Sequence, residues 1–148
     1  MDLRDPTTDA DAVAAALGLA PHPEGGRYRE TWRDAARPDG SRGAGTAIHF
    51  LLAAGERSRW HRVTDAAELW LWQAGWPLDL RVAGGPTVRL GPDVGGGEAL
   101  HALVPAGAWQ CAAPAPGSAW ALVACVVCPA FEFAAFEMAP EGWEPPRP

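Results

Sequence analysis

His61 and Glu68 are the two residues of this chain best suited by type and spacing to acid–base chemistry. They lie on either side of a predicted turn within the segment Ser58–Gly75. If both flanks are β-strands, the two side chains can face one interior. Trp70 and Trp72 then share the face of Glu68, because side chains alternate along a strand. The pattern predicts a pocket with an imidazole, a carboxylate and aromatic walls, which suits a small polar ligand.

Each group has a chemical role and a structural alternative. Imidazole titrates near neutral pH, which makes His61 the natural general base. Glu68 would orient it, or serve as a second acid–base group if apolar walls raise the pKa of the carboxyl. Alternatively, the two residues form a buried pair that only fixes the fold. Trp70 and Trp72 would then be core residues, as aromatic residues often are in β-proteins.

The segment Pro23–Tyr28 is a second candidate. Its adjacent glycines, Gly25 and Gly26, indicate positive φ or a close backbone approach. The simplest interpretation is a tight turn that leads into the first strand. The functional alternative places Glu24 and Tyr28 at the mouth of the pocket or at a dimer seam.

The remaining histidines and an arginine row have less defined expectations. His49 lies in the middle of a predicted strand and could face the pocket. His22 and His101 lie near predicted loops or strand ends, where we expect them to be solvated. Three arginines that alternate on one strand are expected to face solvent, although they could attract a phosphate; these are Arg27, Arg29 and Arg33.

Composition narrows the class of protein. The 148 residues fit one domain, expected to span 1–148 with a core from about 17 to 138, and 20% are charged against 48% hydrophobic. The net charge of −6 and the absence of a basic block argue against nucleic-acid or anionic-membrane binding. No apolar run approaches the ~20 residues of a membrane span. The N-terminus lacks the basic-then-apolar order of a signal peptide, so we expect a cytoplasmic protein.

The cysteines are expected to be structural. Their odd number, three, fits a reducing compartment. Cys125 and Cys128 form a CxxC pattern within an apolar run that is typical of a buried strand. Because residues three apart on a strand point to opposite faces, they would not bind one zinc ion together.

The pattern of elements predicts an all-β protein with one short helix. Asp9 can cap a helix over Asp9–Leu17, and Gly18 can end it. Gly and Pro, 17 and 15 in number, separate short apolar or alternating runs, which favours a sandwich or barrel. The tail Pro140–Pro148 is expected to fray. The predicted strands are Gly26–Arg33, Thr46–Ala53, Arg59–Val63, Ala67–Gln73, Leu78–Val82, Thr87–Leu90, Ala99–Val104, Ala108–Ala112, Ala119–Val127 and Phe131–Phe136.

Several motifs recur here in the order found in one known family. Glu68 followed by six residues and Gly75 matches the end of the first cupin motif, and Pro105–Gln110 matches the start of the second. Around these lie further pieces: Leu17-Gly18-Leu19, Pro21-His22-Pro23-Glu24-Gly25-Gly26, Tyr28, Glu30-Thr31, Ser58-Arg59-Trp60-His61, Glu68-Leu69-Trp70, Val104-Pro105-Ala106-Gly107-Ala108-Trp109-Gln110 and Pro129-Ala130-Phe131-Glu132-Phe133. From about Leu17 to Met138 the chain resembles the cupin-5 family of the cupin superfamily.

The resemblance implies a fold, an assembly and a ligand set. It implies a double-stranded β-helix, or jelly roll, that is usually a homodimer and has a ligand pocket inside the barrel. Metal cupins use two histidines one residue apart, a glutamate and a further histidine. Here only His61 and Glu68 match, while Val63 and Gln110 stand at the other positions. We therefore expect no cofactor, although His61, Glu68 and Gln110 could hold a divalent metal weakly.

The leading functional hypothesis is an isomerase or epimerase that acts without a metal on a sugar or nucleotide-sugar-like molecule. It rests on analogy of fold with epimerase cupins. His61 would move the proton, Glu68 would tune it, Gln110 would orient the substrate, and Trp70 and Trp72 would form walls. Gln110 could equally be a satisfied strand amide. The alternatives are a cupin that binds a small molecule without catalysis, and a metal-dependent oxygenase with a reduced ligand set.

Overall fold

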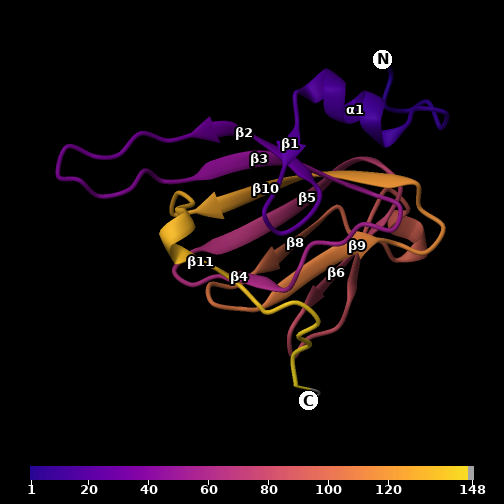
Figure 1. Cartoon of the computed structure of the whole chain (residues 1–148). Helices are drawn as coiled ribbons and strands as arrows, with labels where there is room; N and C mark the ends of the chain where they lie inside the picture. The colour runs from indigo at the N-terminus through magenta and orange to yellow at the C-terminus, as the bar shows by residue number, and fades with distance from the viewer. Residues whose placement is uncertain (147–148) are drawn as a thin grey trace.

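The computed structural model of the chain, described for residues 1–146, has two antiparallel β-sheets that face each other and one short helix (Figure 1). The larger sheet has the strand order β1-β2-β3-β10-β5-β8, and the smaller has β11-β4-β9-β6-β7. This confirms the predicted all-β jelly roll. The elements are α1 (Ala10–Leu17), β1 (Ala20–Pro21), β2 (Arg27–Arg33), β3 (Thr46–Ala53), β4 (His61–Val63), β5 (Ala67–Gly75), β6 (Leu78–Val82), β7 (Val88–Leu90), η1 (Val94–Gly96), β8 (His101–Val104), β9 (Gln110–Pro114), β10 (Trp120–Cys128), η2 (Phe133–Ala135) and β11 (Phe136–Met138).

The helix has the caps expected from the sequence. The Asp9 side chain accepts a hydrogen bond from the backbone N–H of Ala12, and Gly18 ends the helix in the left-handed conformation with φ 64°. The buried face of α1, with Val13, packs on the outside of the larger sheet against Leu51 and others. Within residues 1–146 no helix has the length and hydropathy that crossing a bilayer would require.

The strand pattern agrees with the sequence over most of its length, with two exceptions. A short strand, β1, precedes β2 and pairs with it. The apolar segment 131–136, predicted as one strand, instead forms the short helix η2 and continues into β11, which pairs with β4. Two alanines and three phenylalanines gave that segment a strand-like composition, but the chain turns there at the mouth of the barrel.

The core fills one end of the barrel and leaves the other open. Inward residues of both sheets alternate with outward ones and pack together at the filled end. On β10, for example, Val123 and Cys125 point inward while Leu122 packs outward beneath α1. Cys125 is buried and Cys128 is exposed, which confirms that the two cysteines lie on opposite faces.

The C-terminal segment runs over the outside of the smaller sheet. Trp143 packs against Trp60 and Trp109, with ring centroids 6.1 and 5.0 Å away, and Glu144 forms an ion pair with Arg81. Residues 140–146 of the segment predicted to fray therefore pack on the sheet, and residues 147–148 lie outside the described part of the chain.

Candidate active site

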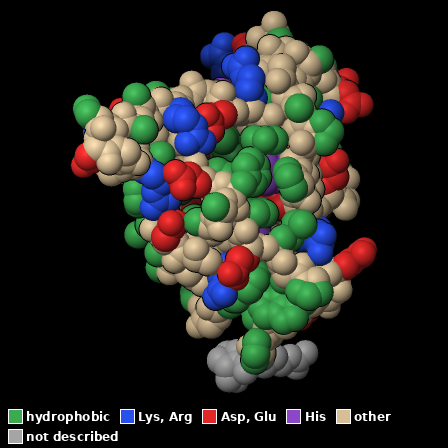
Figure 2. Space-filling view, turned by 60° about the vertical axis from the view of Figure 1, so that its left-hand side comes forward, with side chains coloured by type: hydrophobic (Ala, Val, Ile, Leu, Met, Phe, Trp, Pro, Cys, Tyr) green, Lys and Arg blue, Asp and Glu red, His purple; other side chains and the backbone are tan. Residues whose placement is uncertain are grey.

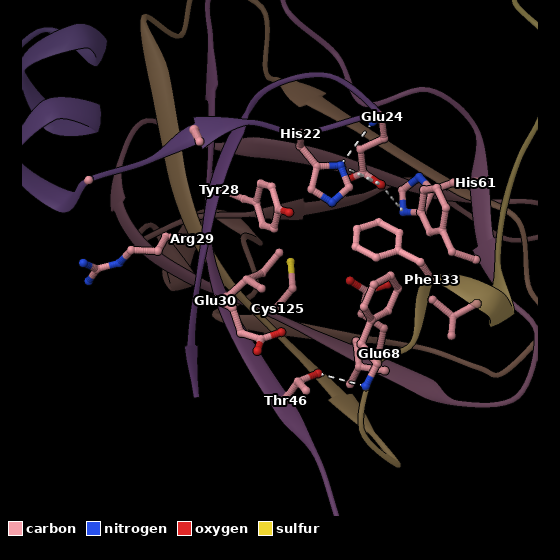
Figure 3. A pocket seen from close by; sticks show the side chains of 17 residues that line it. His22, Glu24, Tyr28, Arg29, Glu30, Thr46, His61, Glu68, Cys125 and Phe133 are labelled. Carbon is pink, nitrogen blue, oxygen red and sulfur yellow. Dashed lines mark hydrogen bonds and ion pairs between the residues drawn. The ribbon is translucent and has the colours of Figure 1, made fainter. Parts of the chain in front are cut away.

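The open end of the barrel holds a cavity of about 400 Å³ (Figure 3). Figure 2 shows hydrophobic side chains around an opening through which histidine and acidic side chains are visible. Strands of both sheets and the segment before β2 contribute to the wall. The lining residues are Gly18, Ala20, His22, Glu24, Tyr28, Arg29, Glu30, Thr46, Ile48, His61, Val63, Glu68, Cys125, Val127, Phe131, Phe133 and Phe136.

Glu24 enters the cavity from the turn between β1 and β2. Gly25 and Gly26 follow it with φ of 107° and 70°, conformations that L-residues with a Cβ rarely adopt. Gly25 also packs so closely on the backbone that an added Cβ would lie 2.5 Å from the carbonyl oxygen of Arg57. The segment is therefore both the tight turn and the element that places Glu24 at the pocket, which the sequence analysis gave as alternatives.

Glu24 and His61 form a buried pair on one side of the cavity. The Nε2 atom of His61 lies 3.0 Å from a carboxyl oxygen of Glu24, and the residues are 2% and 5% exposed. The Nδ1 atom of His61 lies 2.7 Å from the carbonyl oxygen of Arg59. The backbone N–H of Arg59 in turn donates to the carbonyl oxygen of Glu24. Residue 59 therefore holds both members of the pair through its main chain.

These contacts determine where the protons lie. A carbonyl oxygen can only accept, so Nδ1 of His61 carries a proton and its Nε2 is the free acceptor in the neutral ring. Burial lowers the pKa of His61 to about 4. Burial, and secondarily the carboxyl of Glu68, raise the pKa of Glu24 well above its ordinary value. Both pKa shifts favour the pair in which Glu24 carries the proton and donates it to Nε2 of an uncharged His61.

Glu68 faces the cavity from β5 and ends a chain of hydrogen bonds below it. The indole N–H of Trp70 donates to the amide oxygen of Gln110 over 2.7 Å. The amide nitrogen of Gln110 donates to a carboxyl oxygen of Glu68 over 2.6 Å. Trp70, Gln110 and Glu68 are all buried. The hydrogen bonds between them fix the orientation of the Gln110 amide and of the Glu68 carboxyl.

The pKa of Glu68 lies in the range useful for catalysis near neutral pH. Burial raises it to about 7, and the hydrogen bonds from Gln110 and from the thiol of Cys125 offset part of that shift. Because Glu68 also raises the pKa of Glu24, the cavity contains two carboxyl groups that interact electrostatically. Groups of this kind exchange protons readily and cluster at functional sites.

Aromatic rings form most of the remaining wall. His22 lies edge-on to Tyr28, with centroids 4.4 Å apart, and the ring of His61 stacks on Phe136 at 5.5 Å. Phe131 and Phe133 continue this wall, and Phe133 is 55% exposed at the rim. These rings supply flat apolar surfaces around the few polar groups.

The structure brings four of the predicted site residues to the cavity and places four elsewhere. His61, Glu68, Glu24 and Tyr28 line it. Gln110 and Trp70 lie beneath the floor, where their polar atoms are fully used. Trp72 lies at the filled end of the barrel and donates to the carbonyl oxygen of Trp76. His49 is on the outer face of β3, 2.9 Å from the side-chain oxygen of Gln73.

Two expectations from the sequence are corrected here. The walls are not Trp70 and Trp72 but phenylalanines from 131–136, a segment that the sequence predicts as a strand and that begins within a cupin-5 motif. His22 is not solvated: it lines the cavity, accepts a hydrogen bond at Nδ1 from the N–H of Glu24, and has its pKa lowered by burial to about 4. The sequence signal for this position was that His22 lies two residues before Glu24, separated from it by Pro23.

The four buried titratable groups predict an unusual dependence of stability on pH. Glu24 and Glu68 have raised pKas, so their contribution to stability is present below about pH 4.5. The part due to Glu68 is lost as pH rises through about 7, and the part due to Glu24 is lost as pH rises through its own raised pKa. His22 and His61 have lowered pKas, so theirs is present above pH 6.5 and is lost as pH falls through about 4.

The two contributions oppose each other between pH 4.5 and 6.5, and only the carboxyls act above that range. We expect the free energy of unfolding, measured in urea, to fall from pH 6.5 to pH 8, with a slope of at most about 1.4 kcal/mol per pH unit for each proton. A free energy of unfolding that rises over this interval would contradict the protonated state of the buried carboxyls.

Comparison with known proteins identifies the family. Residues 11–139 match the family Cupin_5, described as "Cupin superfamily (DUF985)". The chain belongs to the Cupin_5 family. A hypothetical protein from Leishmania major is 33% identical, with 88% of this chain and 86% of that one covered and a TM-score of 0.79. A Shewanella oneidensis protein is 36% identical, with 90% and 85% covered and a TM-score of 0.82. No curated protein matches the chain.

More distant structures share the fold alone with this Cupin_5 chain. The DMSP lyase DddQ from Ruegeria pomeroyi is 19% identical, with 94% of this chain and 74% of that one covered and a TM-score of 0.60. At that identity the likeness concerns the barrel and carries no chemistry across.

The metal-binding positions of cupins do not fit a transition metal in this Cupin_5 chain. Among residues 1–146 no three His, Cys, Asp or Glu side chains are grouped to hold an ion. Val63 offers no ligand atom, and both polar atoms of Gln110 are already bound to Trp70 and Glu68. The free lone pair of His61 accepts from Glu24. Of these positions only Glu68 presents ligand atoms to the cavity that the other three do not already bind, which is too few for a transition-metal site.

Proposed function

We propose that this Cupin_5 protein is an isomerase or epimerase that moves a proton on a sugar or nucleotide-sugar-like molecule within the barrel, without a metal. One observation carries the proposal: two separate proton-carrying groups face one cavity, the Glu24–His61 pair and Glu68. Isomerisation next to a carbonyl needs a base that removes a proton from carbon and an acid that stabilises the developing oxyanion.

The pKa directions favour a particular division of roles. Glu68, with a pKa of about 7, is ionised in a large part of the molecules at neutral pH and can accept the proton from carbon. Protonated Glu24 can turn from Nε2 of His61 and donate its proton to the carbonyl oxygen of the substrate. The Glu24 carboxylate takes a proton back from the enediol oxygen when the new carbonyl forms. The proton on Glu68 then goes back to the neighbouring carbon or to the other face of the same carbon. We therefore assign proton transfer to Glu68, and to His61 the positioning of Glu24.

The wall of the cavity supports a sugar-like ligand. Flat rings of Tyr28, Phe133 and Phe136 suit the C–H face of a sugar, while the carboxyl and imidazole groups suit its hydroxyls. At the rim, Arg29 points away from the cavity in Figure 3 and makes no ion pair among the described residues. An anionic extension of the substrate, such as a diphosphate, could reach it.

Exchange of substrate hydrogen with solvent deuterium tests this function directly. The protein is incubated in D2O with a panel of aldoses, ketoses and nucleotide sugars, and incorporation is read by proton NMR and mass spectrometry. We expect one deuterium at a carbon next to a carbonyl, only in the presence of protein. If a sugar binds the barrel saturably but acquires no deuterium, the protein is a binding cupin and the proposal is wrong.

A further inference from the structure

A second cavity of about 380 Å³ lies on the outside of the smaller sheet, away from the barrel pocket. It is bounded by the loop before β4 and by the C-terminal segment that crosses the sheet. The lining residues are Arg57, Arg59, Trp60, Pro140, Glu141, Gly142, Trp143 and Glu144. None of them lines the barrel cavity, and the proposed reaction uses none of their side chains.

Two buried hydrogen-bond donors beside the cavity lack a partner within the described residues. The Nε atom of Arg59 and the indole nitrogen of Trp60 are buried and have no hydrogen-bond partner among residues 1–146. Trp60 is only 2% exposed, so its unpartnered N–H is costly unless something accepts from it. It approaches the carboxylate of Glu144 without reaching the geometry of a hydrogen bond.

Two carboxylates line the cavity, those of Glu141 and Glu144, and the second is loosely held. The carboxylate of Glu144 lies 3.1 Å from the Nη2 atom of Arg81 and 3.7 Å from that of Arg57. The three side chains are between 46% and 54% exposed. Ion pairs at this exposure and distance contribute little to stability, so Glu144 can be displaced at small cost.

Four of the eight lining residues are charged, and the indole rings of Trp60 and Trp143 supply the flat apolar surfaces. The guanidinium carbon of Arg81 lies 4.9 Å from the centre of the Trp60 ring, and the rings of Trp60 and Trp143 meet edge to face at 6.1 Å. Stacked arginine and tryptophan planes of this kind favour a planar ligand whose charge is negative.

We propose that this outer cavity is a second ligand site, which binds a planar apolar molecule that carries a carboxylate. In the absence of that ligand, the carboxylate of Glu144 occupies the place of the ligand carboxylate. The incoming carboxylate accepts from Arg81 and Arg57 in place of Glu144, and takes up the free N–H groups of Trp60 and Arg59. Its planar body lies against Trp60 and Trp143.

Calorimetric titration of the full chain with benzoate, at fixed ionic strength, tests the proposal, with benzamide as the neutral control. We expect saturable binding of benzoate and none of benzamide. Arg81→Gln should weaken benzoate binding at least about tenfold, because a charge-assisted hydrogen bond is lost. Glu144→Gln should tighten it several-fold, because the internal competitor loses its charge. Both positions are exposed, so the variants should fold.

Two further variants make the outcome decisive. Arg89→Gln changes an arginine on the same sheet that is paired with Asp79 outside the cavity, and should leave benzoate binding unchanged. Glu68→Gln changes the barrel pocket and should also leave it unchanged. No benzoate binding, equal binding of benzamide, an unaffected Arg81→Gln variant, or loss of binding in Glu68→Gln would each overturn the proposal.

Discussion

Replacing Glu68 by glutamine is expected to lower the rate of deuterium exchange into the substrate by about 10²–10⁴-fold, the usual contribution of one general acid–base group. Glutamine has nearly the same shape, and its side-chain oxygen can still accept the hydrogen bond from Gln110, which is 2.6 Å long in the native protein. What the variant lacks is a group that gains and loses a proton with a pKa of about 7. The rate is measured by proton NMR in D2O at saturating substrate.

The structure offers a matched control for this variant. Glu141 is an exposed glutamate on the C-terminal segment that lines the outer cavity and has no part in the barrel pocket. Glu141→Gln makes the same chemical change and should leave the exchange rate within about twofold of the native value. If Glu68→Gln keeps more than a tenth of the native rate while its circular dichroism is unchanged, Glu68 is not the group that moves the proton.

Replacing Gly25 by alanine is expected to lower the free energy of unfolding by about 2–5 kcal/mol and to remove exchange activity as well. The positive φ of 107° costs about 1–2 kcal/mol for a residue with a Cβ. The new Cβ would also lie 2.5 Å from the carbonyl oxygen of Arg57, and overpacking of this kind costs about 1–3 kcal/mol. To relieve that contact the turn must move, and it carries Glu24 away from His61.

A second glycine separates backbone strain from the clash. Gly55 also has a positive φ, 79°, but nothing lies within 4 Å of the position its Cβ would take. Gly55→Ala should therefore cost only the conformational part, about 1–2 kcal/mol, and leave activity intact. Urea unfolding and the exchange assay are run on both variants. Equal losses of stability, or full activity in Gly25→Ala, would contradict a role of the turn in holding Glu24.

Local signals in the sequence predicted most of the strands, and the resemblance to cupins supplied the jelly-roll topology. The strands Thr46–Ala53 and Leu78–Val82 have the predicted bounds, since alternating side chains and flanking turn residues mark both ends. The helix begins and ends where Asp9 and Gly18 can cap it. The prediction of a strand over 131–136 was wrong because a short apolar cluster has the same pattern whether it pairs in a sheet or surrounds an opening.

The site was harder to predict because it depends on contacts between distant segments. The two cupin motifs pointed to His61 and Glu68, but nothing local shows that Glu24 is the partner of His61. That contact needs the turn after β1 to lie over the barrel mouth. Likewise, Gln110 was expected to face a ligand, yet Trp70 and Glu68 use both of its polar atoms. Strand alternation predicts whether a side chain points into the barrel. It does not predict whether other side chains separate it from the cavity.

Arg59 belongs to both cavities. Its main chain binds Glu24 and His61 inside the barrel, and its side chain lines the cavity outside. A shift of Arg59 moves the N–H that donates to the main-chain carbonyl of Glu24. It also moves the carbonyl oxygen that accepts from Nδ1 of His61. A ligand in either cavity that displaces residue 59 would change the affinity of the other cavity, and such a coupling must act with equal strength in both directions.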